Sequence, residues 1–106
     1  MSQLVVTAYR PRPGQEAELL ACVRDHLPLL RRSGLATDRP GVVMRAADGT
    51  LVEIFEWLSA SAIDRADANS EVRDLWDRFA ACCDYVPLAD LPECRVIFSP
   101  FQPVAP

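Results

Sequence analysis

The sequence of 106 residues contains no lysine, and all eleven of its basic residues are arginine. The absence of lysine excludes Schiff-base chemistry, attachment of pyridoxal phosphate and a phosphate-loop lysine. Positive charge is also in the minority, because fifteen acidic residues give a formal net charge of −4 at pH 7. Such a charge repels the phosphate backbone of nucleic acids and anionic lipid headgroups. The composition therefore argues against nucleic acid and against a membrane surface as partners.

Export and membrane-spanning signals are missing as well. The first residues show no basic leader, no apolar stretch of signal length and no small-residue cleavage site. No run approaches the ~20 apolar residues that cross a bilayer. We therefore expect a cytoplasmic location, where a reducing environment keeps cysteines as free thiols. The chain has a single histidine and four cysteines without a Cys-x-x-Cys pair. This spacing fits no closed metal site, so the sequence predicts neither a metal nor another cofactor.

The length admits one domain, which we place at residues 1–99, followed by a proline-rich tail at residues 100–106 that we expect to lie outside the fold. Half of the residues are hydrophobic. A chain of this size buries only about 60–65% of its surface on folding. Apolar area is therefore left for a partner, and we expect an oligomer.

Apolar periodicity divides the chain into strands and helices. Period-two runs or β-branched residues predict strands at residues 3–9, 40–46, 50–58 and 93–99, and the turn at residues 47–49 joins two of them as a hairpin. Apolar residues at helical spacing predict helices at residues 15–32 and 70–83, with a shorter helix ending near residue 68. Residues 85–92 are irregular between the last helix and the last strand.

The resulting order, β-α-β-β-α-β, predicts an α+β fold: a ferredoxin-like, four-stranded antiparallel sheet with its helices on one face. The strand at residues 50–58 has two mainly apolar rows. One row is Leu51, Glu53, Phe55 and Trp57, and the other is Val52, Ile54, Glu56 and Leu58. A sheet face left to water would be polar. We therefore expect a second copy of the chain to cover that face in a homodimer.

Two short segments resemble a known family. Residues 54–62, Ile-Phe-Glu-Trp-Leu-Ser-Ala-Ser-Ala, are similar to the strand-to-helix motif of the dimeric α+β-barrel superfamily, particularly its antibiotic biosynthesis monooxygenase-like domains. Residues 12–16 resemble the Pro-Gly start of the first helix in the same domains. The resemblance implies two ferredoxin-like units pairing sheet to sheet into a dimeric α/β barrel, each with a pocket between sheet and helices. Its members include cofactor-free oxygenases of aromatic polyketides, haem-degrading enzymes, isomerases and decarboxylases.

The chain departs from that family where the chemistry of many members lies. The histidine that follows the motif tryptophan by nine residues is replaced here by Ala66, with Asp67 after it. The asparagine and histidine of the haem degraders fall at Thr7 and close to Trp76. None of these positions supplies an imidazole, so the oxygenase and haem functions rest on the fold analogy alone.

The chemistry-bearing candidates are one histidine and two glutamates. His26 lies on the apolar stripe of its helix and is the candidate general base, the alternative being a structural histidine bonded to a backbone carbonyl. Glu53 and Glu56 are candidate acids that point to opposite faces of one strand, so only one of them can share a cavity with His26. The alternative to a catalytic role for either glutamate is an ion pair with an arginine such as Arg45 across the hairpin. Arg45 is also a candidate ligand-binding residue.

Aromatic residues are the candidates for holding a ligand. Trp57, Trp76 and Phe79 would line a flat site for an aromatic molecule, although residues at this helical and strand spacing are more often plain core. Tyr85 follows the last helix, where its phenol would reach the pocket mouth. Two functions stay open. One is a cofactor-independent oxygenase-like or isomerase-like enzyme acting on an aromatic or polyketide-like metabolite, and the other is a non-catalytic ligand-binding or assembly module.

Overall fold

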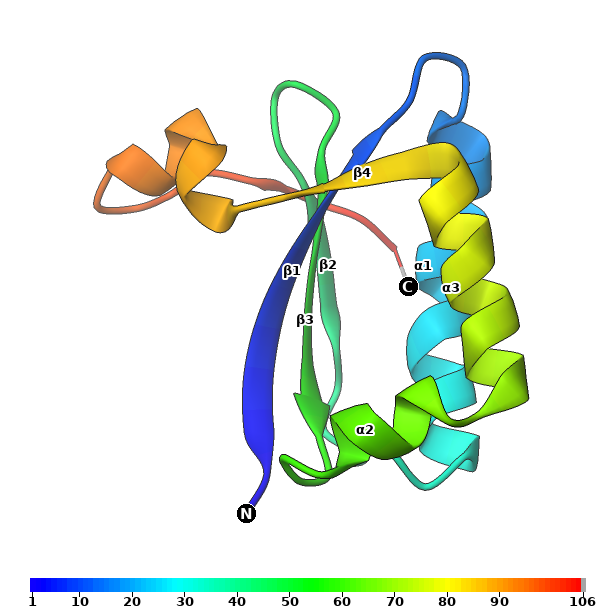
Figure 1. Cartoon of the computed structure of the whole chain (residues 1–106). Helices are drawn as coiled ribbons and strands as arrows, with labels where there is room; N and C mark the ends of the chain where they lie inside the picture. The colour runs from blue at the N-terminus through cyan, green and yellow to red at the C-terminus, as the bar shows by residue number, and fades with distance from the viewer. Residues whose placement is uncertain (106) are drawn as a thin grey trace.

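The computed structural model describes residues 1–105 as one antiparallel sheet with helices against one of its faces (Figure 1). The elements are β1 (Gln3–Pro11), α1 (Glu16–Arg32), β2 (Val42–Arg45), β3 (Leu51–Trp57), α2 (Ala62–Asp67), α3 (Ser70–Cys82), β4 (Cys83–Val86), the 3-10 helices η1 (Leu88–Asp90) and η2 (Pro92–Arg95), and β5 (Gln102–Pro103). The strands pair in the order β4-β1-β3-β2-β5. The α+β class is therefore confirmed. The arrangement is compatible with a ferredoxin-like unit, but the sheet has five strands where four were predicted.

The core forms where the apolar stripes of α1 and α3 meet the helix-side face of β1 and β3. Asn69 is the N-cap of α3, because its side chain accepts a hydrogen bond from the Val72 N–H at 3.1 Å. Gly34 lies just beyond the end of α1 with a φ of 73°, which a glycine adopts without strain. The buried cluster includes Tyr9, Leu19, Leu30, Phe55, Leu75 and Phe79. These six residues come from β1, α1, β3 and α3, so this cluster holds the two long helices to the sheet.

The register of the central strands decides which side chains face the helices. Ala46 and Thr50 close the predicted hairpin, with the Ala46 N–H donating to the Thr50 carbonyl at 2.8 Å. Glu53 lies opposite Val43 on β2 and opposite Thr7 on β1. Side chains of directly opposite residues lie on the same face of a sheet. This register therefore puts Glu53 in the row beneath α1.

The strand that pairs with β1 begins immediately after α3, and the prediction of a strand at residues 93–99 is wrong. Cys83 lies opposite Pro11, and the Arg12 N–H donates to the Cys82 carbonyl at 2.9 Å, so the helix end delivers the chain directly to the sheet edge. Further on, Pro92 begins the helix η2, where a strand was expected. The apolar run at residues 96–98 has strand propensity but forms no ladder.

The chain after β4, residues 87–105, is called the C-terminal segment. It covers half of the far face, which is the sheet face opposite the helices. Leu91 is fully buried there beside Ala8 and Val52, and Cys94 and Phe101 pack against them. The tail also joins the fold, because β5 pairs with β2 and the Val104 N–H donates to the Val43 carbonyl at 3.0 Å. The expectation that the tail lies outside the fold is thus wrong for these residues. Pro106, the last residue of the predicted tail, lies outside the described residues.

The other half of the far face is uncovered within residues 1–105. Leu4, Val6 and Val42 are 58%, 46% and 49% exposed. The chain therefore supplies for itself part of the cover that the sequence analysis assigned to a second copy. None of the helices in residues 1–105 combines the length and the apolar character needed to traverse a bilayer.

Burial of Leu91 predicts that the C-terminal segment stabilises the fold. We expect Leu91→Ala to lower the free energy of unfolding by about 2–5 kcal/mol, the range for a leucine removed from a well-packed core. The matched control is Leu88→Ala, because Leu88 lies three residues away and is 37% exposed. Urea denaturation measures both. Equal midpoints for the two variants would mean that the C-terminal segment is not packed on the sheet.

Candidate functional site

A buried hydrogen-bond network joins the sheet to both long helices around His26. The His26 Nδ1 lies 2.9 Å from Oε1 of Glu53, and the same oxygen accepts a hydrogen bond from the Tyr9 hydroxyl at 2.7 Å. On its other side, His26 Nε2 accepts a hydrogen bond from the indole N–H of Trp76 at 3.1 Å. His26, Glu53 and Tyr9 are 4%, 2% and 2% exposed. The four side chains come from α1, β3, β1 and α3, so the tertiary fold assembles them.

The bonding pattern defines the protonation of this network. The Trp76 indole nitrogen only donates, so Nε2 of His26 carries no proton and Nδ1 donates to Glu53. The histidine is therefore neutral in this arrangement, with its tautomer set by the carboxylate. Burial, and next the negative charge of Glu53, raise the pKa of Tyr9 well above its ordinary value. Tyr9 consequently stays a phenol and a hydrogen-bond donor.

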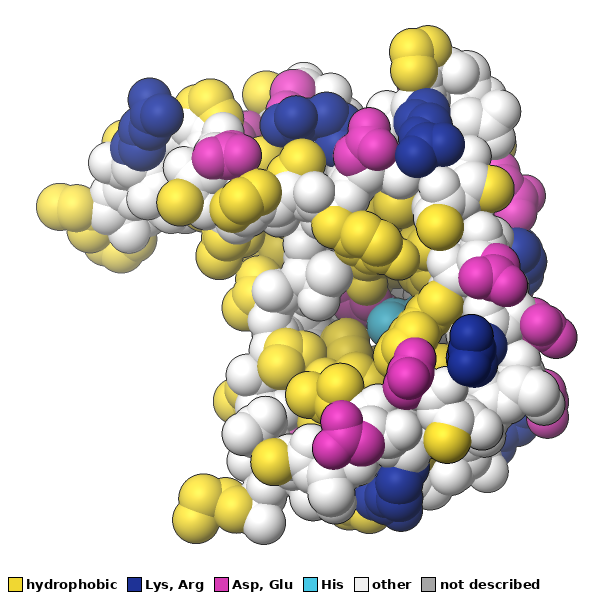
Figure 2. All heavy atoms as spheres, in the orientation of Figure 1, with side chains coloured by type: hydrophobic (Ala, Val, Ile, Leu, Met, Phe, Trp, Pro, Cys, Tyr) yellow, Lys and Arg dark blue, Asp and Glu magenta, His cyan; other side chains and the backbone are white. Residues whose placement is uncertain are grey.

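An aromatic cavity of about 550 Å³ lies beside the network, between β1, β3, β4 and α3. Its walls include Tyr9, His26, Phe55, Trp57, Trp76 and Phe79. Figure 2 shows the hollow from its open side, with the chain's single histidine visible at the floor between hydrophobic side chains. The volume is within the range of small-molecule sites, which are mainly apolar with a few directed polar groups.

The aromatic rings around His26 hold it in place. Phe55 and Phe79 meet the imidazole edge to face, with ring centroids at 5.4 and 5.2 Å. Tyr85 lies on β4 with its ring centroid 5.8 Å from that of Tyr9, and it is 56% exposed. The predicted ligand-binding residues Trp57, Trp76, Phe79 and Tyr85 therefore all line the same cavity as His26.

Glu53 is the acid that shares the helix side with His26, but it does not line the aromatic cavity. It lies behind the imidazole and borders a second, smaller hollow of about 290 Å³ between α1 and β2. Sequence reasoning missed Tyr9 and Phe55. Tyr9 ends the alternating run of the first strand and Phe55 belongs to the same row as Glu53, so the period-two pattern contained a signal for both.

Glu56 and Arg45 lie away from the cavity, and their sequence-based assignments need correction. Glu56 points to the far face, where it accepts hydrogen bonds from Thr37 at 2.7 Å and from Ser2 at 3.1 Å and pairs with Arg39 at 3.2 Å. The hydrogen bond from Thr37 lowers the pKa of Glu56. Arg45 lies opposite Leu51 on β3, and within residues 1–105 the partners of Glu53 and Glu56 are other side chains. Arg45 borders separate hollows near the hairpin instead.

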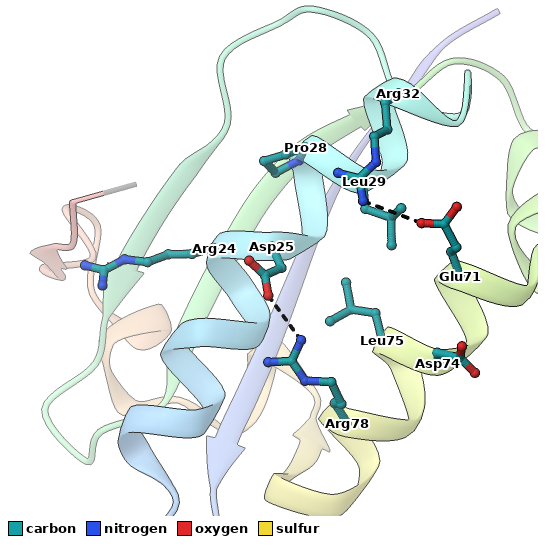
Figure 3. Close-up of a pocket in the computed structure, with 9 residues that line it drawn as sticks. All are labelled: Arg24, Asp25, Pro28, Leu29, Arg32, Glu71, Asp74, Leu75 and Arg78. Carbon is teal, nitrogen blue, oxygen red and sulfur yellow. Dashed lines mark hydrogen bonds and ion pairs between the residues drawn. The ribbon is translucent and has the colours of Figure 1, made fainter.

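A charged groove of about 460 Å³ lies between α1 and α3 (Figure 3). Arg78 donates to both Asp25 and Glu18 at 3.1 Å, and Arg32 lies 3.6 Å from Glu71. These side chains neutralise one another across the groove. The groove therefore offers a ligand few free charges, and its ion pairs serve to join the two helices.

Cys22 and Cys83 provide no reactive thiolate. Cys22, Cys82 and Cys83 are buried, Cys94 is partly buried, and all four are free thiols. Burial raises the pKa of Cys22 and of Cys83 to about 12, so both are protonated at neutral pH. Within residues 1–105, no cluster of histidine, cysteine or acidic side chains is arranged to hold a metal ion.

No family model, curated protein or solved structure matches this chain. Its function is therefore inferred from the residues of the cavity and their geometry.

The burial of the thiols predicts selective labelling. We expect a thiol reagent at pH 8 to modify Cys94 rapidly and the three buried cysteines only as the protein unfolds, because those thiols are inaccessible. Mass spectrometry after a short exposure counts the modified sites, and Cys94→Ser is the control that should remove the rapid one. Rapid labelling of Cys22 would contradict the packing of α1 on α3.

The contacts of Glu56 predict an acid-sensitive contribution to stability. The pKa of Glu56 in the folded state lies below the ordinary value of 4.5. The ionised carboxylate therefore contributes its full stabilisation at pH values above the pKa of the unfolded state. That stabilisation is lost as the pH falls through the pKa of the folded state. We expect Glu56→Gln to be less stable than the wild type at pH 7 and to lose less stability between about pH 5 and pH 3. Urea midpoints at several pH values test this, with Asp77→Asn as the control, because Asp77 is an exposed carboxylate on α3 that has no ion pair within residues 1–105. Parallel pH profiles for the wild type and Glu56→Gln would contradict the assignment.

Proposed function

We propose that the chain acts as a homodimer that binds a small aromatic or polyketide-like molecule in the aromatic cavity and removes a proton from it. The observation that carries the proposal is the placement of His26 at the wall of an apolar cavity. Its Nδ1 is held by Glu53, and its Nε2 is bonded only by Trp76, which itself lines the cavity. A histidine that is oriented by a carboxylate and has its unprotonated nitrogen beside a pocket is arranged as a general base, and Trp76 must release that nitrogen before it accepts a proton.

The proposed reaction is a single balanced proton transfer. A phenol or enol enters the cavity, and the Trp76 indole turns so that its N–H donates to the ligand oxygen. The ligand O–H gives its proton to Nε2 of His26, which leaves a phenolate or enolate and an imidazolium. Glu53 stabilises the imidazolium through Nδ1, and Tyr9 holds the carboxylate in place. Proton removal is a step that isomerases and cofactor-independent oxygenases of aromatic substrates share.

Two further features support an aromatic ligand. Four of the rings in the cavity wall, those of Phe55, Trp57, Trp76 and Phe79, present flat apolar surface on which an aromatic molecule packs. The segment at residues 54–62 also resembles the strand-to-helix motif of antibiotic biosynthesis monooxygenase-like domains. The proton-transfer step is supported by the geometry of His26, because Glu53 orients the imidazole beside the cavity.

The ligand pair 1-naphthol and 1-methoxynaphthalene tests the proposal. The two molecules have similar shape, but only 1-naphthol carries a proton that Nε2 can accept. We expect calorimetry to show 1-methoxynaphthalene binding about tenfold more weakly, because one hydrogen bond of about 1.4 kcal/mol is lost. Bound 1-naphthol should also show the absorption of its anion.

Substitutions assign the effect to His26. We expect His26→Gln to keep the fold and to abolish the naphtholate absorption, because an amide does not accept the proton. Glu56→Gln is the matched control, since Glu56 lies on the far face of the same strand, and it should bind 1-naphthol as the wild type does. A large fall in the melting temperature of His26→Gln, with no naphthol binding by either protein, would reject the base and favour a non-catalytic module in which His26 is structural.

A further inference from the structure

A second hollow, separate from the aromatic cavity, lies between α1 and β2. Its volume is about 290 Å³, and its wall is mostly apolar, with Val23, Leu27 and Val43 among the residues that form it. Within residues 1–105, no side chain borders both this second hollow and the aromatic cavity. His26 borders the cavity and Glu53 borders the second hollow, so the hydrogen bond between these two residues connects the two spaces.

The inner end of the second hollow carries a negative charge with one oxygen left open. Oε1 of Glu53 accepts the hydrogen bonds of Tyr9 and His26, and within residues 1–105 Oε2 accepts none. The fully buried side-chain oxygen or nitrogen without a partner in this part of the chain is Oγ1 of Thr50. Oε2 is not of this kind, so part of its surface is open, and the hollow that Glu53 borders is the second hollow. Because both donors to Oε1 are uncharged, the carboxylate attracts a cation to Oε2.

The outer end of the second hollow carries two positive charges. Arg24 and Arg31 both border it, about two turns apart on the same side of α1. In the part of the chain that the structure describes, both guanidinium groups donate to backbone carbonyls and have no ion pair. Arg31 donates to Thr37 at 3.0 Å and to Arg39 at 2.6 Å, and Arg24 donates to Ala105 at 3.4 Å. Each guanidinium has five N–H donors, so donors are left for an anion.

The exposure of these charged groups gives the hollow a direction. Arg24 is exposed and Arg31 is half-buried, whereas Glu53 is 2% exposed. Figure 3 shows the Arg24 side chain leaving α1 on the side away from α3. The arginines therefore lie at the mouth of the hollow and the carboxylate lies at its inner end, with apolar wall between them.

From this charge pattern we infer that the second hollow binds an ω-amino carboxylate, a linear molecule with an ammonium at one end and a carboxylate at the other. The ammonium pairs with Oε2 of Glu53, the carboxylate with Arg24 and Arg31, and the methylene chain packs on the apolar wall. At ~30 Å³ for each water molecule the hollow has room for about ten of them, and 6-aminohexanoate, with about nine non-hydrogen atoms, is of that size.

Such a ligand also acts on the aromatic cavity. Its ammonium takes up part of the negative charge with which Glu53 would stabilise the His26 imidazolium, so proton transfer to Nε2 becomes less favourable. The second hollow is then an effector site for the cavity, and this step alone rests on the proposed function. The binding of the ω-amino carboxylate itself does not depend on it.

Three ligands of similar length test the charge pattern by calorimetry. We expect 6-aminohexanoate to bind the wild type, and hexanoate and hexylammonium each to bind at least about tenfold more weakly, because each lacks one of the two charged ends. Hexanoate as tight as 6-aminohexanoate would mean that Glu53 is not read by the ligand and would overturn the inference. Absence of 6-aminohexanoate binding at millimolar concentration would overturn it as well.

Substitutions locate the ligand. We expect Glu53→Gln, which keeps an oxygen for Tyr9 and His26 but removes the charge, to bind 6-aminohexanoate at least about tenfold more weakly. The double variant Arg24→Gln/Arg31→Gln should show a similar loss and tests the site even if Glu53→Gln does not fold.

The matched control is Arg32→Gln, because Arg32 lies next to Arg31 but pairs with Glu71 and does not border the second hollow. It should bind 6-aminohexanoate as the wild type does. Wild-type affinity in the Arg24→Gln/Arg31→Gln variant, or an equal loss in Arg32→Gln, would overturn the site.

Naphthol binding separates this inference from the proposed function. If 6-aminohexanoate binds and 1-naphthol does not, the second site stands and the proposed function is rejected. If 1-naphthol binds and 6-aminohexanoate does not, the second site is rejected and the proposed function stands. With both correct, saturating 6-aminohexanoate should weaken 1-naphthol binding several-fold and lower the naphtholate absorption, and 1-naphthol should weaken 6-aminohexanoate binding by the same factor. Binding of each ligand without effect on the other would overturn the coupling through Glu53.

Discussion

The single carboxylate oxygen Oε1 of Glu53 is the point on which the interior depends. It accepts hydrogen bonds from Tyr9 on β1 and His26 on α1, and through the imidazole it is connected to Trp76 on α3. A carboxylate that is 2% exposed is costly in a chain of this length unless its charge is met by donors. Two donors at 2.7 and 2.9 Å supply that compensation. The same bonds set the relative positions of the sheet and both long helices.

This network fixes the orientation of side chains at the cavity wall as well as holding the core together. Replacing a buried polar cluster by apolar residues of similar volume often leaves stability unchanged or raises it, so the network is better understood through the orientation it imposes. Glu53 sets the tautomer of His26, and the edge-to-face contacts of Phe55 and Phe79 prevent the ring from turning. The imidazole therefore presents one defined nitrogen, Nε2, to the side where Trp76 borders the cavity. Preorganisation of this kind is what general-base chemistry requires.

A different constraint acts on the far face. A chain of 106 residues can bury only a limited amount of surface. The C-terminal segment leaves the sheet after β4, crosses the far face through Leu91 and Phe101, and returns to the edge of β2. It covers one half of an apolar face and leaves Leu4, Val6 and Val42 uncovered. The short β4 has a second consequence, because it pairs with only the second half of β1 and leaves the outer edge of the first half open beside the cavity. The route of the chain after α3 therefore explains both where the cavity opens and why the far face is only partly covered.

Sequence patterns alone determined the α+β class, the two long helices, the central hairpin and the aromatic character of the site, because period and turn chemistry are local properties. The pattern of β3 showed that Glu53 and Glu56 point to opposite faces, but not which of them meets His26. Only the register against β1 and the packing of α1 decided that. Propensity placed the fourth strand at residues 93–99, whereas the end of α3 against Pro11 placed it at Cys83–Val86. Strand pairing and the meeting of distant side chains depend on contacts between remote segments, and no local pattern encodes them.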